Sequence, residues 1–337
     1  MGLRIALDAM GGDHAPGEIV KGAIEAAEEL DLQILLVGRP DAIEPLLAEA
    51  SASARSRLDI VAASEVIAMD ESPATALRKK KDASIVVATR LVKEGRAQAL
   101  VSAGSTGAQM AASLLGLGRI SGIDRPAIAT ILPTLEGGKL LLDVGANSEA
   151  KPRNLLQFAH MGSIYAEKVM GIANPRVALL NIGEEETKGN ELVLGAYGML
   201  REAPLRFIGN VEGRDLFFGR ADVIVCDGFV GNVVLKFGEG MVSALKTMIK
   251  DELKNSRMAQ VGAFLATPAL RGMGKRLDYA EYGGAPLLGV NGVSIICHGS
   301  SKAKAIKNAL RVARQGVQQN FIAAIQEHIP GKVEPVC

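Results

Sequence analysis

Residues that cross-link a chain or ligate metals are scarce in this sequence. Of the 337 residues, three are Cys, none of them in a CxxC pair, and four are His. The sequence therefore predicts neither a disulfide framework nor a zinc site, and it is typical of a reducing cytoplasm. Asp8, Asp13 and His14 form only a weak metal signature, so we expect no metal. The net charge of +1 argues against a protein built mainly to coat nucleic acid.

Long hydrophobic runs and the common nucleotide motifs are also missing. The longest uncharged span, residues 97–118, is long enough to cross a bilayer, but its Gly, Ser, Thr and Gln residues favour a strand, a loop and a helix. Residues 3–8 are typical of a strand, with no signal-peptide pattern, so we expect a cytoplasmic protein. The chain has no GxxxxGK[ST], no correctly spaced dinucleotide fingerprint and no GxSxG. This indicates no nucleotide cofactor and no serine nucleophile of the hydrolase type.

Short apolar runs alternate with longer amphipathic segments along the chain. Hydrophobic residues make up 48% of the sequence, enough for a full core, and most runs are apolar throughout, as in strands buried on both faces. Helical patterns include residues 18–30, 73–93 and 301–327. We predict one α/β/α unit of three layers over residues 1–337, with a mostly parallel mixed sheet. The predicted strands are residues 3–7, 32–37, 58–61, 99–101, 127–132, 140–144, 177–182, 205–208, 223–226 and 293–297.

One stretch, residues 233–277, has no strand pattern. Residues 233–254 have helical spacing of apolar side chains, and residues 258–265 are followed by Thr267-Pro268, a cap-and-proline start of a further helix. We predict an inserted helical hairpin that projects from the sheet. Its tip combines apolar residues with Lys and Arg, which suits either a membrane surface or a helix pair buried in a dimer interface. The tip residues expected to contact the membrane are Val261, Phe264, Leu265 and Leu270.

Gly, Asn, Asp and Ser residues collect directly after the predicted strands. Ligands of parallel sheets bind outside the carboxyl ends of the strands, so these loops should converge on one cleft. Several of them offer backbone N–H groups before a helix, which suits phosphate, and Lys188 or Arg214 could supply a counter-charge. The candidate phosphate or substrate residues are Asp8, Gly11, Gly12, Asp13, His14, Ser102, Gly104, Ser105, Thr106, Gly107, Asp143, Asn147, Asn181, Arg214, Asp227, His298 and Ser300.

Several of these motifs resemble one family. Residues 8–16 (DAMGGDHAP) are similar to the opening of the bacterial phosphate acyltransferases of phospholipid synthesis, which are acyl-[acyl carrier protein]:phosphate acyltransferases. The resemblance continues in the same order along essentially the whole chain. Ser105 departs from the pattern, which usually has Asn there. The other matching runs are residues 142–147, 181–183, 188–190, 227–232, 282–285 and 298–300.

The resemblance implies transfer of a fatty acyl group from acyl carrier protein to inorganic phosphate, which yields an acyl phosphate and free carrier protein. It implies a fold like that of the isocitrate and isopropylmalate dehydrogenases and the phosphotransacetylases. It also implies a homodimer, and in some members a peripheral membrane contact through a helical projection. The acyl phosphate would then feed a membrane glycerol-3-phosphate acyltransferase.

The residues suit such a reaction chemically. Phosphate is itself the nucleophile and a thiolate leaves readily, so the site must hold an anion and stabilise a tetrahedral oxyanion. Lys188 is the leading catalytic candidate for the positive charge, and Asn232 for a neutral donor. A solvated lysine and a helix-capping asparagine would have the same pattern. Cys226 and Cys297 end buried strands, which we interpret as core thiols.

An acidic carrier protein should dock on a basic face. The densest basic run is Arg78-Lys79-Lys80-Lys81, of which two or three side chains can share one helix face, and the hairpin cations compete for this role. Two other hypotheses remain open. One is a phosphotransacetylase-like enzyme acting on acyl-coenzyme A, and the other is a non-catalytic phosphate-binding scaffold at the membrane.

Overall fold

The computed structural model describes residues 2–254, 256–276 and 279–329. In this part of the chain eleven strands form one sheet, in the order β3-β2-β1-β4-β11-β10-β5-β6-β9-β7-β8. The strands are β1 (Arg4–Asp8), β2 (Gln33–Gly38), β3 (Leu58–Ala62), β4 (Ala99–Ser102), β5 (Ala127–Thr134), β6 (Gly137–Leu142), β7 (Val177–Asn181), β8 (Phe207–Glu212), β9 (Val223–Val225), β10 (Ala285–Leu288) and β11 (Val293–Ile296).

Helices connect most of these strands. The α-helices are α1 (Gly17–Glu29), α2 (Pro40–Ile43), α3 (Ala52–Arg55), α4 (Pro73–Lys79), α5 (Ser84–Lys93), α6 (Thr106–Gly116), α7 (Pro152–Lys168), α8 (Glu191–Glu202), α9 (Gly228–Lys254), α10 (Arg257–Arg276), α11 (Tyr279–Tyr282), α12 (Ala303–Gln318) and α13 (Phe321–His328). Two 3-10 helices, η1 (Glu44–Glu49) and η2 (Gly213–Phe218), lie among them.

The sheet is mostly parallel, as predicted, but it changes direction in the middle. Strands β3, β2, β1, β4 and β11 are parallel to one another, and so are β6, β9, β7 and β8. Between these halves, β10 is antiparallel to both β11 and β5, and β5 is antiparallel to β6. The expectation that all carboxyl-end loops share one edge of a parallel sheet therefore needs correction, because the two halves run in opposite directions.

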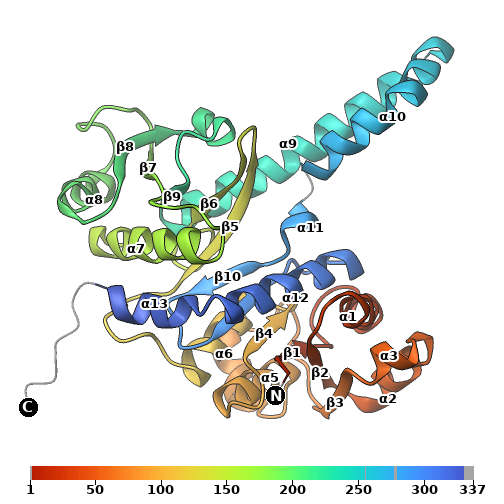
Figure 1. Cartoon of the computed structure of the whole chain (residues 1–337). Coiled ribbons are helices and arrows are strands. Elements are labelled where there is room, and N and C mark those ends of the chain that lie inside the picture. Colours follow the sequence, from red (N-terminus) through yellow and green to blue (C-terminus); the bar gives the residue numbers. More distant parts are fainter. Residues whose placement is uncertain (1, 255, 277–278, 330–337) are drawn as a thin grey trace, which may run out of the picture.

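Helices cover both faces of the sheet, which gives the predicted three layers (Figure 1). One buried cluster joins α1, α7, α12 and α13 to one face. On the other face, α4, α5 and α6 cover the half that contains β1 and β2, while α6 and α9 contribute to the cluster over β5, β6 and β9. The predicted α/β/α fold class is thus confirmed.

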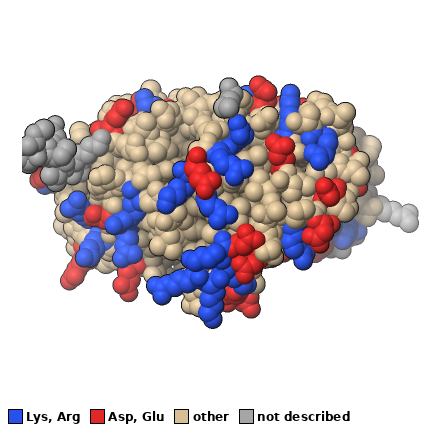
Figure 2. Space-filling view, turned by 90° about the horizontal axis from the view of Figure 1, so that it is seen from below, with Lys and Arg blue, Asp and Glu red and all other residues tan. Residues whose placement is uncertain are grey.

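Charged side chains of both signs are spread over the surface. On the face seen in Figure 2, Lys and Arg side chains are concentrated at the middle and the lower edge, with Asp and Glu among them. Within the described ranges, no helix has both the length and the apolar character that a membrane span requires.

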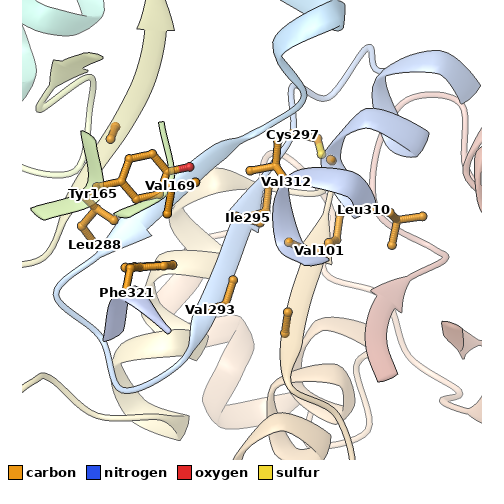
Figure 3. Packing of buried hydrophobic residues seen from close by; sticks show 14 of the residues in the cluster. Val101, Tyr165, Val169, Leu288, Val293, Ile295, Cys297, Leu310, Val312 and Phe321 are labelled. Carbon is orange, nitrogen blue, oxygen red and sulfur yellow. The ribbon is translucent and has the colours of Figure 1, made fainter. Parts of the chain in front are cut away.

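The central core forms where α12 and α13 pack on the strands at which the sheet reverses (Figure 3). Val293 and Ile295 of β11 and Leu310 of α12 belong to this cluster and are buried. The rings of Tyr165 and Phe321 meet edge to face, with centroids 5.3 Å apart. Such aromatic packing fixes α7 against α13 and so connects the two halves of the sheet.

Several element predictions differ from the structure. Residues 301–327, for example, form two helices, α12 and α13, instead of one. Strand β10 was not predicted, because Gly283, Gly284 and Pro286 are turn signals. Residues 73–93 form two helices, α4 and α5, instead of one. Their separation has a physical cause: Lys80 donates from Nζ to the carbonyl of Val66, and an isolated bridge pairs residue 65 with residue 83, so residues 80–83 extend along a neighbouring segment.

The predicted hairpin consists of α9 and α10, which project together from the body of the molecule (Figure 1). The predicted helix start at Thr267-Pro268 is wrong, since α10 runs through Pro268. Instead of capping a new helix, Thr267 donates from Oγ1 to the carbonyl of Ala263 at 2.9 Å. Water can hydrate the carbonyl that loses its donor at a proline when the helix is exposed. Residue 277, the expected end of the hairpin, lies outside the described residues.

Candidate active site

The loops after β6 and β9 are built around a buried carboxylate, Asp143. Its oxygens accept hydrogen bonds from the backbone N–H groups of Ile128, Gly145 and Ala146, at 3.0 to 3.1 Å. They also accept from both the backbone and the side-chain nitrogen of Asn147, each at 2.8 Å. Burial raises the pKa of Asp143 while these bonds oppose the rise. Asp143 and Asn147 therefore hold the β6 loop from inside the protein.

Helix α9 begins directly on this loop. A Cβ atom on Gly231 would lie 1.8 Å from the carbonyl oxygen of Asp143, and one on Gly228 would lie 2.7 Å from the carbonyl oxygen of Asn147. Only glycine permits this approach. Asp227 accepts hydrogen bonds from the N–H groups of Phe229 and Val230 at 3.0 Å, so it caps α9. The close approach brings the Asn232 amide against Gly145.

The loops after β1, β4 and β11 form a second connected group. Asp8 is buried and accepts from Ser102 Oγ at 2.7 Å, and Ser102 Oγ accepts in turn from the N–H of Gly104 at 3.0 Å. Burial raises the pKa of Asp8. A Cβ on Gly11 would meet Asp8 Oδ2 at 2.6 Å, which makes glycine necessary at that position too. These residues hold the first turn of α6 in place.

A cavity of about 590 Å³ opens between the two groups of loops. Its polar lining includes Thr106 and Gly107 at the start of α6, Gly145 from the β6 loop, Asn232 from α9 and His298 from the β11 loop. Four of the predicted site residues are thus brought together: Thr106, Gly107, Asn232 and His298. The volume is within the range of about 300–1,000 Å³ that is typical of small-molecule sites.

The remaining walls of the cavity are largely apolar. They include Met110 of α6, Ile131 and Leu132 of β5, and Leu235 and Val242 of α9. A polar end built from loops thus continues into an apolar chamber between a helix and the sheet. Such a space suits a ligand with one anionic or polar end and one hydrocarbon end.

His298 has a defined hydrogen-bonding state at this cavity. Its Nδ1 accepts from the backbone N–H of Ser300 at 3.2 Å and lies 2.8 Å from Ser300 Oγ. Because a backbone N–H can only donate, Nδ1 must be an acceptor, and in the neutral ring Nε2 then carries the proton. Ser300 thereby makes the His298 ring a donor through Nε2.

The predicted cations of the β7 and β8 loops do not line the cavity. Lys188 is exposed, and its carbonyl accepts from Asn181 Nδ2 at 3.0 Å, so Asn181 fixes the backbone next to it. Arg214 is also exposed and pairs through Nε with Glu212 at 2.6 Å. Lys188 has no ion-pair partner within the described residues, whereas Arg214 has one.

The other predicted residues lie in the loops after β1 and β4, which contact the loop after β11. Gly12 has a φ of +108° and approaches the carbonyls of Ala103 and Gly299, while the N–H of Asp13 donates to Gly299 at 2.8 Å. His14 is exposed. Ser105 caps α6 by accepting from Ala108 N at 3.4 Å, which gives this serine a structural role at the position where the resemblance expects Asn.

Two thiols end buried strands, as interpreted from the sequence. Cys226 and Cys297 are each 4% exposed. Burial raises the pKa of both thiols, that of Cys297 to about 12. A thiol with a raised pKa is a poor nucleophile at neutral pH, even though Cys297 lines the cavity.

Some cavity residues were not predicted as site residues. Ser301 belongs to the recognised loop after β11, as His298 does, and both residues line the cavity. Phe217 and Lys236 come a few residues after the loops that follow β8 and β9, while Lys246 lies farther along α9. Helix α9 has apolar residues on more than one face. Only the packing of α9 on β6 decides which of its faces is the inner one.

Known proteins are similar to this chain along nearly its whole length. Residues 3–324 match the model of the family described as fatty acid synthesis protein. The chain is 97% identical over 335 residues to the phosphate acyltransferase of Heliobacterium modesticaldum, covering 99% of this chain and all of that one. It is 63% identical to the phosphate acyltransferase of Desulfitobacterium hafniense DCB-2, covering 97% and 98%.

Solved structures with little sequence identity share the fold. A phosphotransacetylase from Streptococcus pyogenes superposes with a TM-score of 0.66 at 16% identity, covering 94% of each chain. A 4-hydroxythreonine-4-phosphate dehydrogenase from Klebsiella pneumoniae gives a TM-score of 0.55 at 14% identity, covering 94% of this chain and all of that one. The fold predicted from the resemblance is confirmed, and the full-length match shows that this chain belongs to the fatty acid synthesis protein family, together with these phosphate acyltransferases.

Proposed function

We propose that this chain is an enzyme that transfers a fatty acyl group from acyl carrier protein to inorganic phosphate and releases acyl phosphate. One observation carries the proposal: a single cavity joins the first turn of α6, lined by Thr106 and Gly107, to an apolar chamber. The first N–H groups of a helix and its positive dipole end favour phosphate. The chamber favours a hydrocarbon chain. The two ends of an acyl phosphate match the two ends of the cavity.

In the proposed reaction, phosphate bound at α6 attacks the thioester carbonyl carbon. A P–O oxygen forms the new C–O bond, and the carbonyl oxygen becomes an oxyanion. When the tetrahedral intermediate collapses, the C–S bond breaks and the carrier protein leaves as a thiolate, which takes a proton from water. Asn232 Nδ2 and the Nε2–H of His298 are the neutral donors that would stabilise the oxyanion.

We propose that Lys188 supplies the positive charge. Its ammonium group is exposed and without an ion pair in the described structure, whereas the guanidinium of Arg214 is held by Glu212. A free lysine is a compact charge on a flexible stem, so it can approach a phosphate that enters from solvent. The positioning of its backbone by Asn181 gives Asn181 a supporting role.

The carrier protein is proposed to dock on a basic surface. Arg78, Lys79 and Lys81 are exposed, while Lys80 is engaged with Val66 and Glu71. Three exposed cations at the end of α4 can therefore attract an acidic partner.

The projecting helices are proposed to contact a second copy of the chain and the membrane. Five apolar residues of α9 are 45–67% exposed and follow one another at helical spacing: Val233, Phe237, Met241, Leu245 and Met248. This exposed face of α9 is the proposed dimer surface.

On α10, Val261, Phe264 and Leu265 are 62%, 79% and 73% exposed, which suits insertion between lipid headgroups. Leu270 lies in α10, but its side chain is outside the described residues. A peripheral position at the membrane would bring the acyl phosphate close to a downstream glycerol-3-phosphate acyltransferase.

The test is phosphate-dependent release of thiol from palmitoyl-[acyl carrier protein], with hydroxylamine used to trap the acyl phosphate. We expect one hydroxamate for each thiol released and no release without phosphate. Palmitoyl-coenzyme A serves as the parallel substrate. Turnover of the coenzyme A thioester alone would favour a phosphotransacetylase-like activity. Phosphate binding with no cleavage of either thioester would favour a scaffold.

A further inference from the structure

A second apolar groove borders the apolar chamber of the cavity, which is the proposed acyl site. The groove, of about 500 Å³, is lined by Pro133 and Leu135 at the end of β5 and by Ala269, Gly272 and Met273 of α10. Phe217 and Pro133 line both the groove and the chamber. These two residues therefore lie where the chamber borders the groove beside α10.

Phe217 lies between the chamber and the groove. Its carbonyl accepts from the N–H of Leu135 at 3.0 Å, which ties η2 to the turn between β5 and β6. Its ring reaches α9, with Cζ 4.0 Å from the position of a Cβ on Gly238. Phe217 is thus held by its backbone at the turn after β5, and its ring lies beside α9. Its side chain is 43% exposed.

We propose that Phe217 sets the longest acyl chain that the chamber accepts, by separating the chamber from the groove at α10. The inference rests on the proposed function, and it identifies a specificity-determining residue for it. Each methylene moved from water into an apolar site strengthens binding by about fourfold. This gain in binding ends where the acyl chain reaches the Phe217 ring. Methylenes beyond that point either stay in water and add no affinity, or must displace the ring.

The test compares kcat/KM for decanoyl, palmitoyl and arachidoyl groups, all carried by the same acyl carrier protein so that docking stays constant. In Phe217→Ala we expect the arachidoyl-to-palmitoyl ratio of kcat/KM to rise at least tenfold, and by up to about 250-fold when all four added methylenes enter the groove at about fourfold each. Phe218→Ala is the matched control. Phe218 is the adjacent residue of η2, is 60% exposed and lines neither space, so its ratio should equal that of the wild type.

A second variant narrows the chamber at α9, where Val242 lines it. Val242→Phe fills part of the chamber, and we expect it to lower the palmitoyl-to-decanoyl ratio of kcat/KM at least tenfold, because the longer chain needs more of the chamber. An unchanged circular dichroism spectrum shows that the variant folds.

The two proposals fail in different ways. If the wild type releases no thiol from any carrier-protein thioester in the presence of phosphate, the proposed function is overturned. If the wild type is active but Phe217→Ala and Phe218→Ala change all chain lengths by the same factor, the role of Phe217 is overturned. A loss of decanoyl and palmitoyl transfer together in Val242→Phe, in a folded protein, would also count against the chamber as the acyl site.

Discussion

At the scale of single residues, two acidic motif residues are buried and hold loops in place through hydrogen bonds. Asp8 and Asp143 are 2% and 0% exposed, and their oxygens accept hydrogen bonds from neighbouring loops. A buried carboxylate is tolerated only when it is well hydrogen-bonded. Each of them holds a loop whose later residues line the cavity. The polar groups that line the cavity include hydroxyls, an amide, an imidazole, backbone N–H groups and the cations Lys236 and Lys246, together with the carboxylate of Glu239. Donors and cations outnumber the carboxylate, which suits an anionic ligand.

Lys188 is the residue whose role a substitution tests most directly. We expect Lys188→Ala to lower the rate of acyl transfer by about 10²–10³ through loss of charge stabilisation, with an unchanged circular dichroism spectrum because the side chain is exposed. The measurement is phosphate-dependent thiol release. Lys168→Ala, which removes an exposed lysine at the end of α7, is the control and should retain full activity. Wild-type turnover in Lys188→Ala would show that acyl transfer does not need the positive charge of Lys188.

At the scale of elements, α9 serves two surfaces. Its inner side contributes Leu235 and Val242 to the cavity, while Phe237 and Met248 on another side are 67% and 64% exposed. A helix that is apolar on most sides is normally covered all round. The exposed side of α9 and the apolar end of α10 therefore need partners, and the two partners need not be the same.

The two helices can be separated by charge substitutions. We expect Phe237→Glu on α9 to shift the protein from dimer to monomer in analytical ultracentrifugation, and Phe264→Glu on α10 to weaken flotation with anionic vesicles about tenfold or more, the scale of one buried phenyl ring. Each variant is the control for the other. Loss of the dimer in Phe264→Glu with vesicle binding intact would place the α10 residues in the interface between subunits.

At the scale of the whole molecule, the reversal of the sheet determines where the cavity lies. Because β10 and the β5–β6 pair turn the strand direction around, the loops divide into one group after β1, β4 and β11 and another after β6 and β9. The cavity lies between the groups and is lined by both. A ligand there contacts both halves of the molecule at once.

This position predicts stabilisation of the whole fold by phosphate. A ligand that binds only the folded state at about one hundred times its Kd adds about 2.7 kcal/mol to the free energy of unfolding, so we expect phosphate to raise Tm by several degrees in a single transition. Chloride at equal ionic strength is the control. Thr106→Val, which removes one donor at the start of α6, should reduce the shift. An equal rise with chloride would mean that the effect is ionic and not a bound phosphate.

Much of the fold followed from local pattern. Continuous apolar runs located ten strands within a few residues, because strands buried on both faces require them. Strand β10 was missed because its Gly and Pro residues are typical of a turn. The continuation of α10 through Pro268 was missed because proline usually ends a helix, whereas an exposed helix can hydrate the carbonyl that loses its donor. The loops that carry Thr106, Asn232 and His298 were recognised, since Gly and Asn after a strand are a local signal.

The sequence by itself determined the fold class, the family and the residue types available for chemistry, because strand periodicity, turn residues and motif order are all local properties of the chain. Only the tertiary structure decided which loops meet. Strand order and direction depend on contacts between distant segments. Because of these contacts, Asp143 is buried, Lys188 lies outside the cavity and Phe217 lies between the chamber and the groove. Which side of α9 lines the cavity and which stays exposed also follows from the approach of Gly231 to Asp143, a contact between residues far apart in sequence.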